Sequence, residues 1–212
     1  MAIPVNGSVA GSSGLSFSAV QEAIKAGLYA DLANIIDTLE LEVSAAGASK
    51  PQDWPYAIQI LAHVFNHDLN SARFVWKRTP DAVKQSNPEL VAAWKIVQCM
   101  WMHDHAGVYA ALRAYSWASD VQQVVAAVGE DYSHGMLKLL STAYSTVSVV
   151  DAAAFLGLSE NDVVTFTSQQ HGWGLDPATK MLTVMPMVAA ATKKTDSSQL
   201  QNLTEYVFHL EH

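Results

Sequence analysis

A pair of histidines, His63 and His67, has a spacing that could hold a metal ion. The two residues are four positions apart, so they would lie on one face of a helix and could share an ion. The helical zinc-protease motif H-E-x-x-H also requires a glutamate directly after the first histidine, and Val64 stands there instead. The pair therefore lacks the general base that this chemistry needs.

His103 and His105 form a second candidate, an H-x-H pair of the kind that some metal-dependent isopeptidases use. That motif needs a serine and an aspartate at set distances downstream, where Arg113 and Ser116 stand. Three protein ligands are the usual minimum for a catalytic zinc ion, and this segment supplies two. The H-x-H pair alone is therefore weak evidence for a hydrolase.

The two histidine pairs have a simpler interpretation. His67-Asp68 and His103-Asp104 are the same dipeptide, and we expect them to be helix-end residues in corresponding turns of a repeated structure. This interpretation predicts no metal site and no cofactor.

Other catalytic signatures are also missing. The sequence contains no G-x-S-x-G elbow, no P-loop and no G-x-G-x-x-G motif. The one cysteine, Cys99, lies in an apolar helical pattern with no basic residue beside it, which favours a buried, inert thiol. Glu40 and Glu42 should fall on different helix faces as solvated charges. We therefore expect a protein that is not an enzyme.

The composition indicates a protein that binds other proteins. The chain has 212 residues, 50% of them apolar and only 15% charged, whereas about 25% charged is typical. The surface of such a protein carries fewer charged side chains than usual, and exposed apolar surface often marks a binding site for other proteins. The net charge of −8 argues against nucleic acid as a partner. We find no apolar run long enough to span a membrane and no signal peptide, so we expect an intracellular protein without membrane contact.

Residues 1–14 are predicted to be a disordered lead-in, because they have no charged side chain and are rich in Gly and Ser. Residues 15–135 show helical spacing and faint repeats. HDLNSAR at 67–73 resembles HDHAGVY at 103–109, and AGLYADL at 26–32 resembles AGVYAAL at 106–112, eighty positions later. Such periods are typical of helix-hairpin solenoids of the TPR or HEAT kind. The alternative is chance similarity between alanine-rich helices.

Residues 136–186 predict a winged-helix subdomain. Ser148 with Asp151, and Ser159 with Asp162, fit the capping box that opens a helix, and Gly157 would end the first of these two helices. An Asp-Pro turn then separates two short apolar segments, which predicts a hairpin. Two capped helices followed by a hairpin are the order of a winged helix.

Residues 187–197 have no periodicity and are predicted to be a linker, followed by a C-terminal helix over residues 198–212. The apolar residues of that helix are spaced three, four and three apart, as in the seam of a helical bundle. A single helix of this length is marginally stable in water, so it must pack against something. The seam consists of Leu200, Leu203, Val207 and Leu210, with Tyr206 beside it.

Local charge disfavours nucleic-acid binding through the winged helix. Between Ser148 and Asp176 the chain has no Lys or Arg but has acidic side chains at both ends and in the second capped helix. Phosphate groups would meet no counter-charge there. The remaining use of the wing is its strand edge, to which a neighbouring chain can add a strand. A basic cluster, Arg73, Lys77, Arg78 and Lys84, is explained by a solvated face or a protein contact.

A helical repeat that ends in a non-basic winged helix and a bundle helix resembles the PCI-domain family. Within that family, the wording of several segments resembles the subunit-eight branch of the COP nine signalosome in its plant form. The resemblance runs from about Ala30 to His212. It is carried by DLNSARFVWKRTP at 68–80, GVY at 107–109, AAFLGL at 153–158, GW at 172–173 and LTEYVFHLE at 203–211.

The resemblance implies a mainly α fold and a non-catalytic scaffold subunit. In this family the assembled complex removes a ubiquitin-like tag from cullin-RING ligases through a different subunit, in nucleus and cytoplasm, and in plants it represses photomorphogenesis. The resemblance also implies that winged helices associate edge to edge, that C-terminal helices form a bundle, and that subunit three is the direct neighbour. The residues expected at partner interfaces are Trp173, Leu182, Val184, Leu200, Leu203, Tyr206, Val207 and Leu210.

Three alternatives stay open from the sequence. The chain could be the small PCI subunit of the proteasome lid or of a translation initiation factor, or a nucleic-acid-binding winged-helix protein. Trp173 could contact a partner or fill the core of its own domain.

Overall fold

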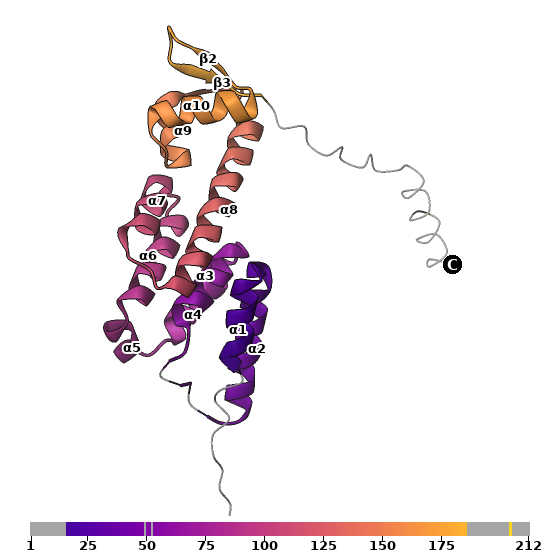
Figure 1. The fold of residues 1–212 in the computed structure, drawn as a ribbon, viewed down its shortest axis with the longest axis vertical. Helices are drawn as coiled ribbons and strands as arrows, with labels where there is room; N and C mark the ends of the chain where they lie inside the picture. The colour runs from indigo at the N-terminus through magenta and orange to yellow at the C-terminus, as the bar shows by residue number, and fades with distance from the viewer. Residues whose placement is uncertain (1–15, 49, 52, 186–203, 205–212) are drawn as a thin grey trace, which may run out of the picture.

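The structure is a computed structural model that describes residues 16–48, 50–51, 53–185 and 204. It is mainly helical, with a helical body and a small winged helix at one end (Figure 1). The helices of the body are α1 (Ser16–Lys25), α2 (Tyr29–Ala45), α3 (Tyr56–Phe65), α4 (Leu69–Arg78), α5 (Asp81–Ser86), α6 (Pro88–Trp101), α7 (His105–Ala114) and α8 (Ser119–Ala143). The winged helix contains β1 (Thr146–Ser148), α9 (Val149–Leu156), α10 (Glu160–His171), β2 (Gly174–Asp176) and β3 (Met181–Thr183).

Three helix pairs, α1–α2, α3–α4 and α6–α7, are joined by the same turn. In each turn one residue has a left-handed backbone: Gly27 at φ 71°, His67 at φ 58° and His103 at φ 56°. The next amide donates to a carbonyl five residues earlier, over 2.9 Å in all three turns. This is the Schellman arrangement that ends helices. The prediction that His67-Asp68 and His103-Asp104 occupy corresponding turns is confirmed.

One detail of the predicted repeat is wrong. The sequence comparison aligned Gly27 with Gly107, eighty positions later, but the residue that corresponds to Gly27 is His103. The error is four residues, close to one helical turn. A shift of one turn leaves the same face of a helix buried, so the apolar pattern could not reveal it.

The turn aspartates also start the following helices. Asp68 accepts a hydrogen bond from the Ser71 amide at 3.0 Å, and Asp104 accepts one from the Gly107 amide at 2.9 Å. A side-chain oxygen at this position satisfies an amide that the helix itself leaves free. Each His-Asp dipeptide therefore ends one helix and starts the next.

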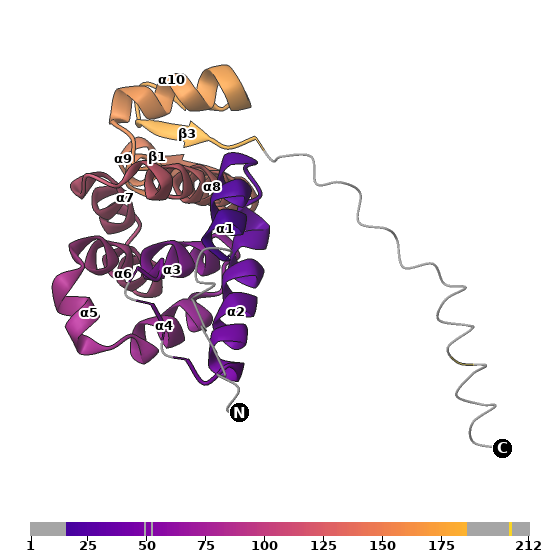
Figure 2. The same ribbon diagram turned by 60° about the horizontal axis from the view of Figure 1, so that its bottom comes forward.

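Helix α3 is the centre of the body. Every residue from Tyr56 to Val64 is buried, and α3 packs against α2, α4, α6 and α8 (Figure 2). A helix covered on all sides is mostly apolar around its circumference. The buried polar exceptions in α3 are Gln59 and His63.

Helix α8 links the two cores of the protein. Its first half contributes Val121, Val124 and Val128 to the core of the body, and its second half contributes Leu137 and Leu140 to the core of the winged helix. The boundary proposed from the sequence, between residues 135 and 136, lies inside this helix. A continuous helix is stiffer than a loop, so it fixes the winged helix relative to the body.

The winged helix has the two capped helices and the hairpin that the sequence predicts. The Ser148 hydroxyl accepts from the Asp151 amide at 3.0 Å and donates to the Asp151 carboxylate at 2.6 Å, and Ser159 and Asp162 do the same. Gly157 ends α9 with a left-handed backbone, φ 63°. Strand β3 lies between β1 and β2 and pairs antiparallel with both. The sequence did not predict β1, which has only three residues.

Several predicted segments lie outside the described residues. These are the lead-in 1–14, the linker 187–197 and the terminal helix 198–212 except Thr204, which is helical and exposed.

Candidate interaction surfaces

The histidines of the first pair face different partners. His63 is buried in α3 and its Nε2 lies 3.3 Å from Asp37 Oδ1 without the geometry of a hydrogen bond. His67 lies in the turn, largely exposed, with its Nε2 3.5 Å from Asp131 Oδ2. The two residues are four positions apart, but α3 ends at Phe65, so His67 lies beyond its last turn. They therefore do not form a shared ligand pair.

The second pair is separated in the same way. His103 occupies the left-handed turn position, and His105 begins α7. The Nδ1 of His105 is hydrogen-bonded to the Tyr132 hydroxyl at 2.7 Å, and its ring contacts Phe155 of α9 with centroids 5.0 Å apart. Burial lowers the pKa of His105, and the charge of His103 acts in the same direction. Burial is also the main cause that raises the pKa of Tyr132 to about 12. His105 is thus a half-buried residue that packs between the body and the winged helix.

Within the part of the chain that the structure describes, no three side chains of the His, Cys, Asp or Glu types gather as a metal site. Cys99 is buried in α6, as predicted.

The prediction that Glu40 is a solvated charge is wrong. Its side chain is 13% exposed and accepts from Lys50 Nζ at 2.8 Å, from Gln59 Nε2 at 2.7 Å and from Arg78 at 3.3 Å. Burial alone would raise its pKa, but the hydrogen bonds from Lys50 and Gln59 and the two positive charges lower the pKa overall. The residue anchors α2 to α3 and α4, and only Glu42 remains a surface charge.

The side chains of the wing also differ from expectation. Trp173, Leu182 and Val184 were expected at a partner interface, but they are only 3%, 0% and 6% exposed. They form the core of the winged helix with Leu137, Leu140, Leu156 and Val163. A domain this small needs its largest apolar side chains for its own core. In this structure the three side chains pack inside the subdomain, and their role at a partner interface stays a prediction.

What the wing presents instead is backbone. Strands β1 and β2 are the outer strands of the sheet, and their outward edges have no strand partner among the described residues. Exposed edges are templates for adding a strand from another chain. Large apolar side chains are exposed in the same subdomain, namely Val150 at 58%, Met185 at 57% and Leu175 at 41%.

The charge of the winged helix disfavours nucleic acid. Helix α10, in the place of a recognition helix, carries Glu160 and Asp162 in its first turn. Among residues 136–185 the basic side chains are Lys138 and Lys180, against four acidic ones. A helix that enters a DNA groove needs cations to replace the counterions of the phosphates.

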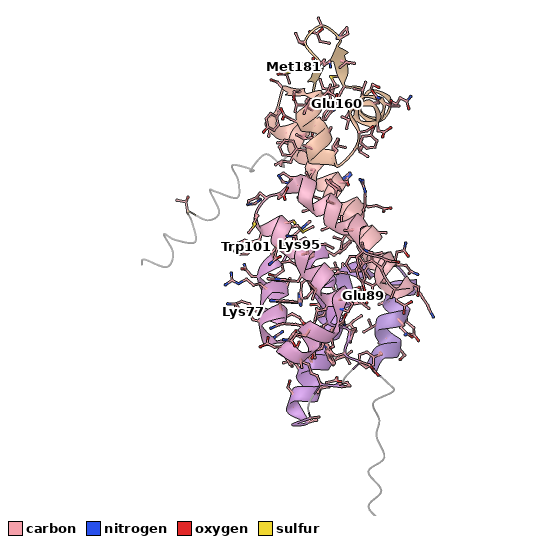
Figure 3. All side chains as sticks on the ribbon, turned by 90° about the vertical axis from the view of Figure 1, so that its left-hand side faces the viewer. Lys77, Glu89, Lys95, Trp101, Glu160 and Met181 are labelled. Carbon is pink, nitrogen blue, oxygen red and sulfur yellow. The ribbon has the colours of Figure 1, made fainter. Side chains whose placement is uncertain are left out.

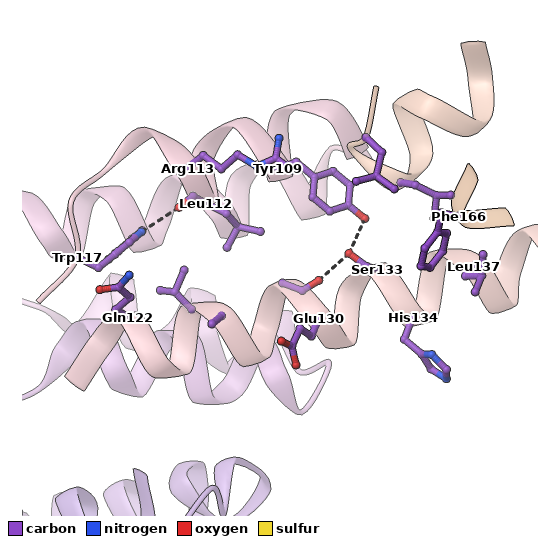
Figure 4. A pocket seen from close by; sticks show the side chains of 15 residues that line it. Tyr109, Leu112, Arg113, Trp117, Gln122, Glu130, Ser133, His134, Leu137 and Phe166 are labelled. Atoms are coloured by element: carbon purple, nitrogen blue, oxygen red, sulfur yellow. Dashed lines mark hydrogen bonds between the residues drawn. The ribbon is translucent and has the colours of Figure 1, made fainter. Parts of the chain in front are cut away.

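An open groove joins the body to the winged helix and was not found from the sequence. It has a volume of about 680 Å³ and lies along α7 and α8, with Leu156, Leu158 and Phe166 closing one end (Figure 4). The Tyr109 hydroxyl accepts from Ser133 at 3.3 Å at its edge, and Trp117 Nε1 donates to the Leu112 carbonyl at 3.0 Å.

The predicted seam of the terminal helix, Leu200, Leu203, Tyr206, Val207 and Leu210, lies outside the described residues. No helix among the described residues combines the length and apolarity that a membrane span requires.

Comparison with protein families gives a match over most of the chain. The family described as CSN8/PSMD8/EIF3K matches residues 50–194. This range contains the helical body from just before α3 and the whole winged helix.

Three similar curated proteins carry the same name. COP9 signalosome complex subunit 8 of Arabidopsis thaliana is 46% identical over 198 residues, which cover 93% of this chain and 100% of the relative. The protein of that name from Danio rerio is 35% identical over 82% of this chain and 90% of its own length. The one from Xenopus laevis is 38% identical over 81% and 87%.

Proposed function

The chain belongs to the CSN8/PSMD8/EIF3K family and to its COP9 signalosome subunit 8 branch, and we propose that it is a non-catalytic scaffold subunit of a signalosome. The observation that carries this proposal is the similarity, over 81–93% of the chain, to subunit 8 proteins of a plant and of vertebrates. The winged helix supports it, because the outer edges of β1 and β2 have no strand partner among the described residues and four acidic side chains outnumber its two lysines.

The proposed partners follow from the same assignment. Other signalosome subunits bind the chain directly, with subunit three as its neighbour, and cullin-RING ligases meet it through the assembled complex. The reaction is removal of the ubiquitin-like tag from cullins by another subunit, in nucleus and cytoplasm, and in plants it serves repression of photomorphogenesis. The chain helps to hold the other subunits in place and supplies no reacting group.

Two surfaces are proposed to hold the chain in the complex. The first is the backbone edge of the winged-helix sheet, formed by β1 and β2. The second is the predicted seam of residues 198–212, which would join a bundle with the terminal helices of other subunits. The proposal includes the subdomain division at residues 135/136. This division separates the helical repeat from the winged helix, whose sheet edge would bind other subunits.

The family name also includes a proteasome-lid subunit and an initiation-factor subunit. We place the chain with the signalosome because the relatives quoted above all carry that name.

A capture experiment tests the assignment. The full chain with an affinity tag is expressed in Arabidopsis seedlings, and its stable partners are identified by mass spectrometry. The expected catch contains the other signalosome subunits in equal amounts with the chain. A catch rich in proteasome-lid or initiation-factor subunits and free of signalosome subunits would refute the proposal. An untagged extract is the control for unspecific capture.

A further inference from the structure

The body carries an aromatic and basic face on α4, α5 and α6. Figure 3 shows Lys77, Lys95 and Trp101 on one side of the body. We define the α4–α6 face by its aromatic and basic side chains. They are Arg73, Trp76, Lys77, Lys84, Trp94, Lys95 and Trp101.

The aromatic rings of this face are held in fixed positions. Trp76 of α4 stacks on Trp94 of α6, with ring centroids 4.9 Å apart and planes within 2°. The Arg73 guanidinium lies 5.3 Å from the Trp101 ring centre, and Lys84 Nζ lies 5.2 Å from that of Trp76. Cation–π contacts of this kind orient both partners. The face is therefore ordered before any partner arrives.

Part of the face is apolar surface that the body leaves uncovered. Trp101 is 49% exposed and Met102 is 77% exposed. Beside them is a hollow of about 130 Å³, about the size of one apolar side chain, which is lined by Arg73, Trp94, Val97, Gln98, Trp101 and Met102. Trp and Arg are the residues that most often dominate protein interfaces, particularly around a pocket that one partner residue fills.

The charge of the face is opposite to that of the protein. Residues 69–102 contain five basic and two acidic side chains, although the whole chain has a net charge of −8. Both acids are engaged: Asp81 pairs with Lys84 at 3.0 Å, and Glu89 accepts from the Ala118 amide at 2.9 Å. Lys77 and Lys95 of the same face are exposed.

We propose that the α4–α6 face binds an acidic peptide segment of another protein, with one large apolar residue of that segment in the hollow beside Trp101. The positive rim fits carboxylates, and the hollow fits a single side chain. Electrostatic complementarity of this kind selects partners and speeds association. This surface lies outside the sheet edges and the terminal seam, so the proposal goes beyond assembly of the complex and does not rest on it.

Single-stranded nucleic acid fits this face less well. Bases bind by stacking on open aromatic rings, along a groove of positive charge. Here Trp76 already has Trp94 stacked on it and Lys84 over it, and Trp101 has Arg73 over it. The net negative charge of the chain also repels a polyanion.

The probe is a fluorescein-labelled, glutamate-rich peptide with a central Leu-Phe pair, titrated with the full chain and followed by anisotropy. We expect saturable binding that weakens as salt is added. A peptide with Ser-Ser in place of Leu-Phe should bind about tenfold more weakly, because the hollow stays empty. A uridine oligonucleotide is titrated in parallel.

Two variant pairs locate the site. Lys77→Glu with Lys95→Glu should weaken peptide binding about tenfold, whereas Lys25→Glu with Lys138→Glu changes the net charge equally at exposed positions elsewhere and should leave it unchanged. Trp101→Gln should abolish the preference for Leu-Phe. Leu139→Gln, at a side chain 48% exposed against 49% for Trp101, is its control.

Several results would overturn the proposal. They are no binding of the acidic peptide, equal weakening by the control pair, or tighter binding of the uridine oligonucleotide at the same residues. Dimerisation of the free chain that Trp101→Gln abolishes would show that a second copy covers this face instead, which would also overturn it.

Discussion

The Tyr109 ring of α7 lies directly against the Cα of Gly157, the residue that ends α9. Beside it, the Arg113 guanidinium donates to the Gly157 carbonyl at 2.9 Å. Gly157 thus packs against one side chain of α7 and accepts a hydrogen bond from another. This contact, together with the continuous helix α8, fixes the winged helix to the repeat and therefore fixes where its sheet edges point.

Replacing Gly157 with alanine should destabilise the chain strongly. The new Cβ would overlap the Tyr109 ring, lying 2.7 Å from its Cδ1 atom. The backbone at φ 63° is also unfavourable for alanine. The backbone term is about 1–2 kcal/mol and the overpacking term about 1–3 kcal/mol. We expect a loss of about 2–5 kcal/mol, measured by urea unfolding.

Gly172→Ala is the matched control. Gly172 ends the other helix of the winged helix at φ 66°, but a Cβ there would meet no atom within 4 Å. It should lose only the backbone term of about 1–2 kcal/mol. Equal losses in the two variants would contradict the role of the Tyr109 contact.

The two capping boxes give a second prediction. Ser148→Ala and Ser159→Ala should each reduce the free energy of unfolding by about 1 kcal/mol, because each removes the acceptor for an early helix amide. Ser168→Ala is the control, since its hydroxyl donates to the Val164 and Thr165 carbonyls inside α10 and caps no helix amide. A control variant as destabilised as the two cap variants would show that the hydroxyls act by another route.

The half-buried His105 should make stability depend on pH. Its pKa lies below the ordinary value of 6.5, mainly because of burial, so the unfolded chain binds more protons than the folded one in this range. The stabilisation is present above pH 6.5 and is lost as the pH falls through the folded pKa. His105→Gln should lose less stability than the parent between about pH 7.5 and pH 5.5.

Charged neighbours require a control for this pH effect. His103 and Asp104 lie beside His105, and the Tyr132 hydroxyl faces its ring. Urea unfolding is therefore measured at both pH values for His105→Gln and for His134→Gln, which replaces an exposed histidine of α8. Parallel behaviour of His105→Gln and the parent would remove His105 as the source.

The terminal seam gives a prediction about assembly. Leu203→Asp with Val207→Asp should prevent incorporation into the complex and leave thermal unfolding of the free chain unchanged, because the seam is proposed to pack on other subunits. Asn202→Asp with His209→Asp, off the seam, should still assemble. Much earlier melting of the seam variant as a free chain would show that the helix belongs to the chain's own core.

Local signals in the sequence predicted the local structure well. Serine–aspartate spacings predicted both capping boxes, Gly157 predicted the end of α9, and the repeated His-Asp dipeptides predicted corresponding turns. Each of these depends on hydrogen bonds between residues close in the chain. The sequence alone could therefore express them.

What the sequence could not show depends on residues far apart in the chain. Glu40 forms ion pairs with Lys50, which lies after α2, and with Arg78 of α4. Neither sequence separation fits a helical repeat, so the sequence gives no sign of these contacts. The groove along α7 and α8 is lined by residues of both the body and the winged helix, which are far apart in the chain. From the sequence, Trp173 could be an interface or a core residue, because an apolar side chain near a hairpin fits both. The structure shows it buried in the core of the winged helix.

Reconstitution tests the central claim most directly. The Arabidopsis signalosome is assembled from its purified subunits with this chain in place of its own subunit 8, and the product is weighed by native mass spectrometry. A structural subunit predicts one complete complex that holds a single copy of this chain and removes the tag from a modified cullin. A complex that forms and acts without the chain, while the chain stays free in solution, would contradict the account.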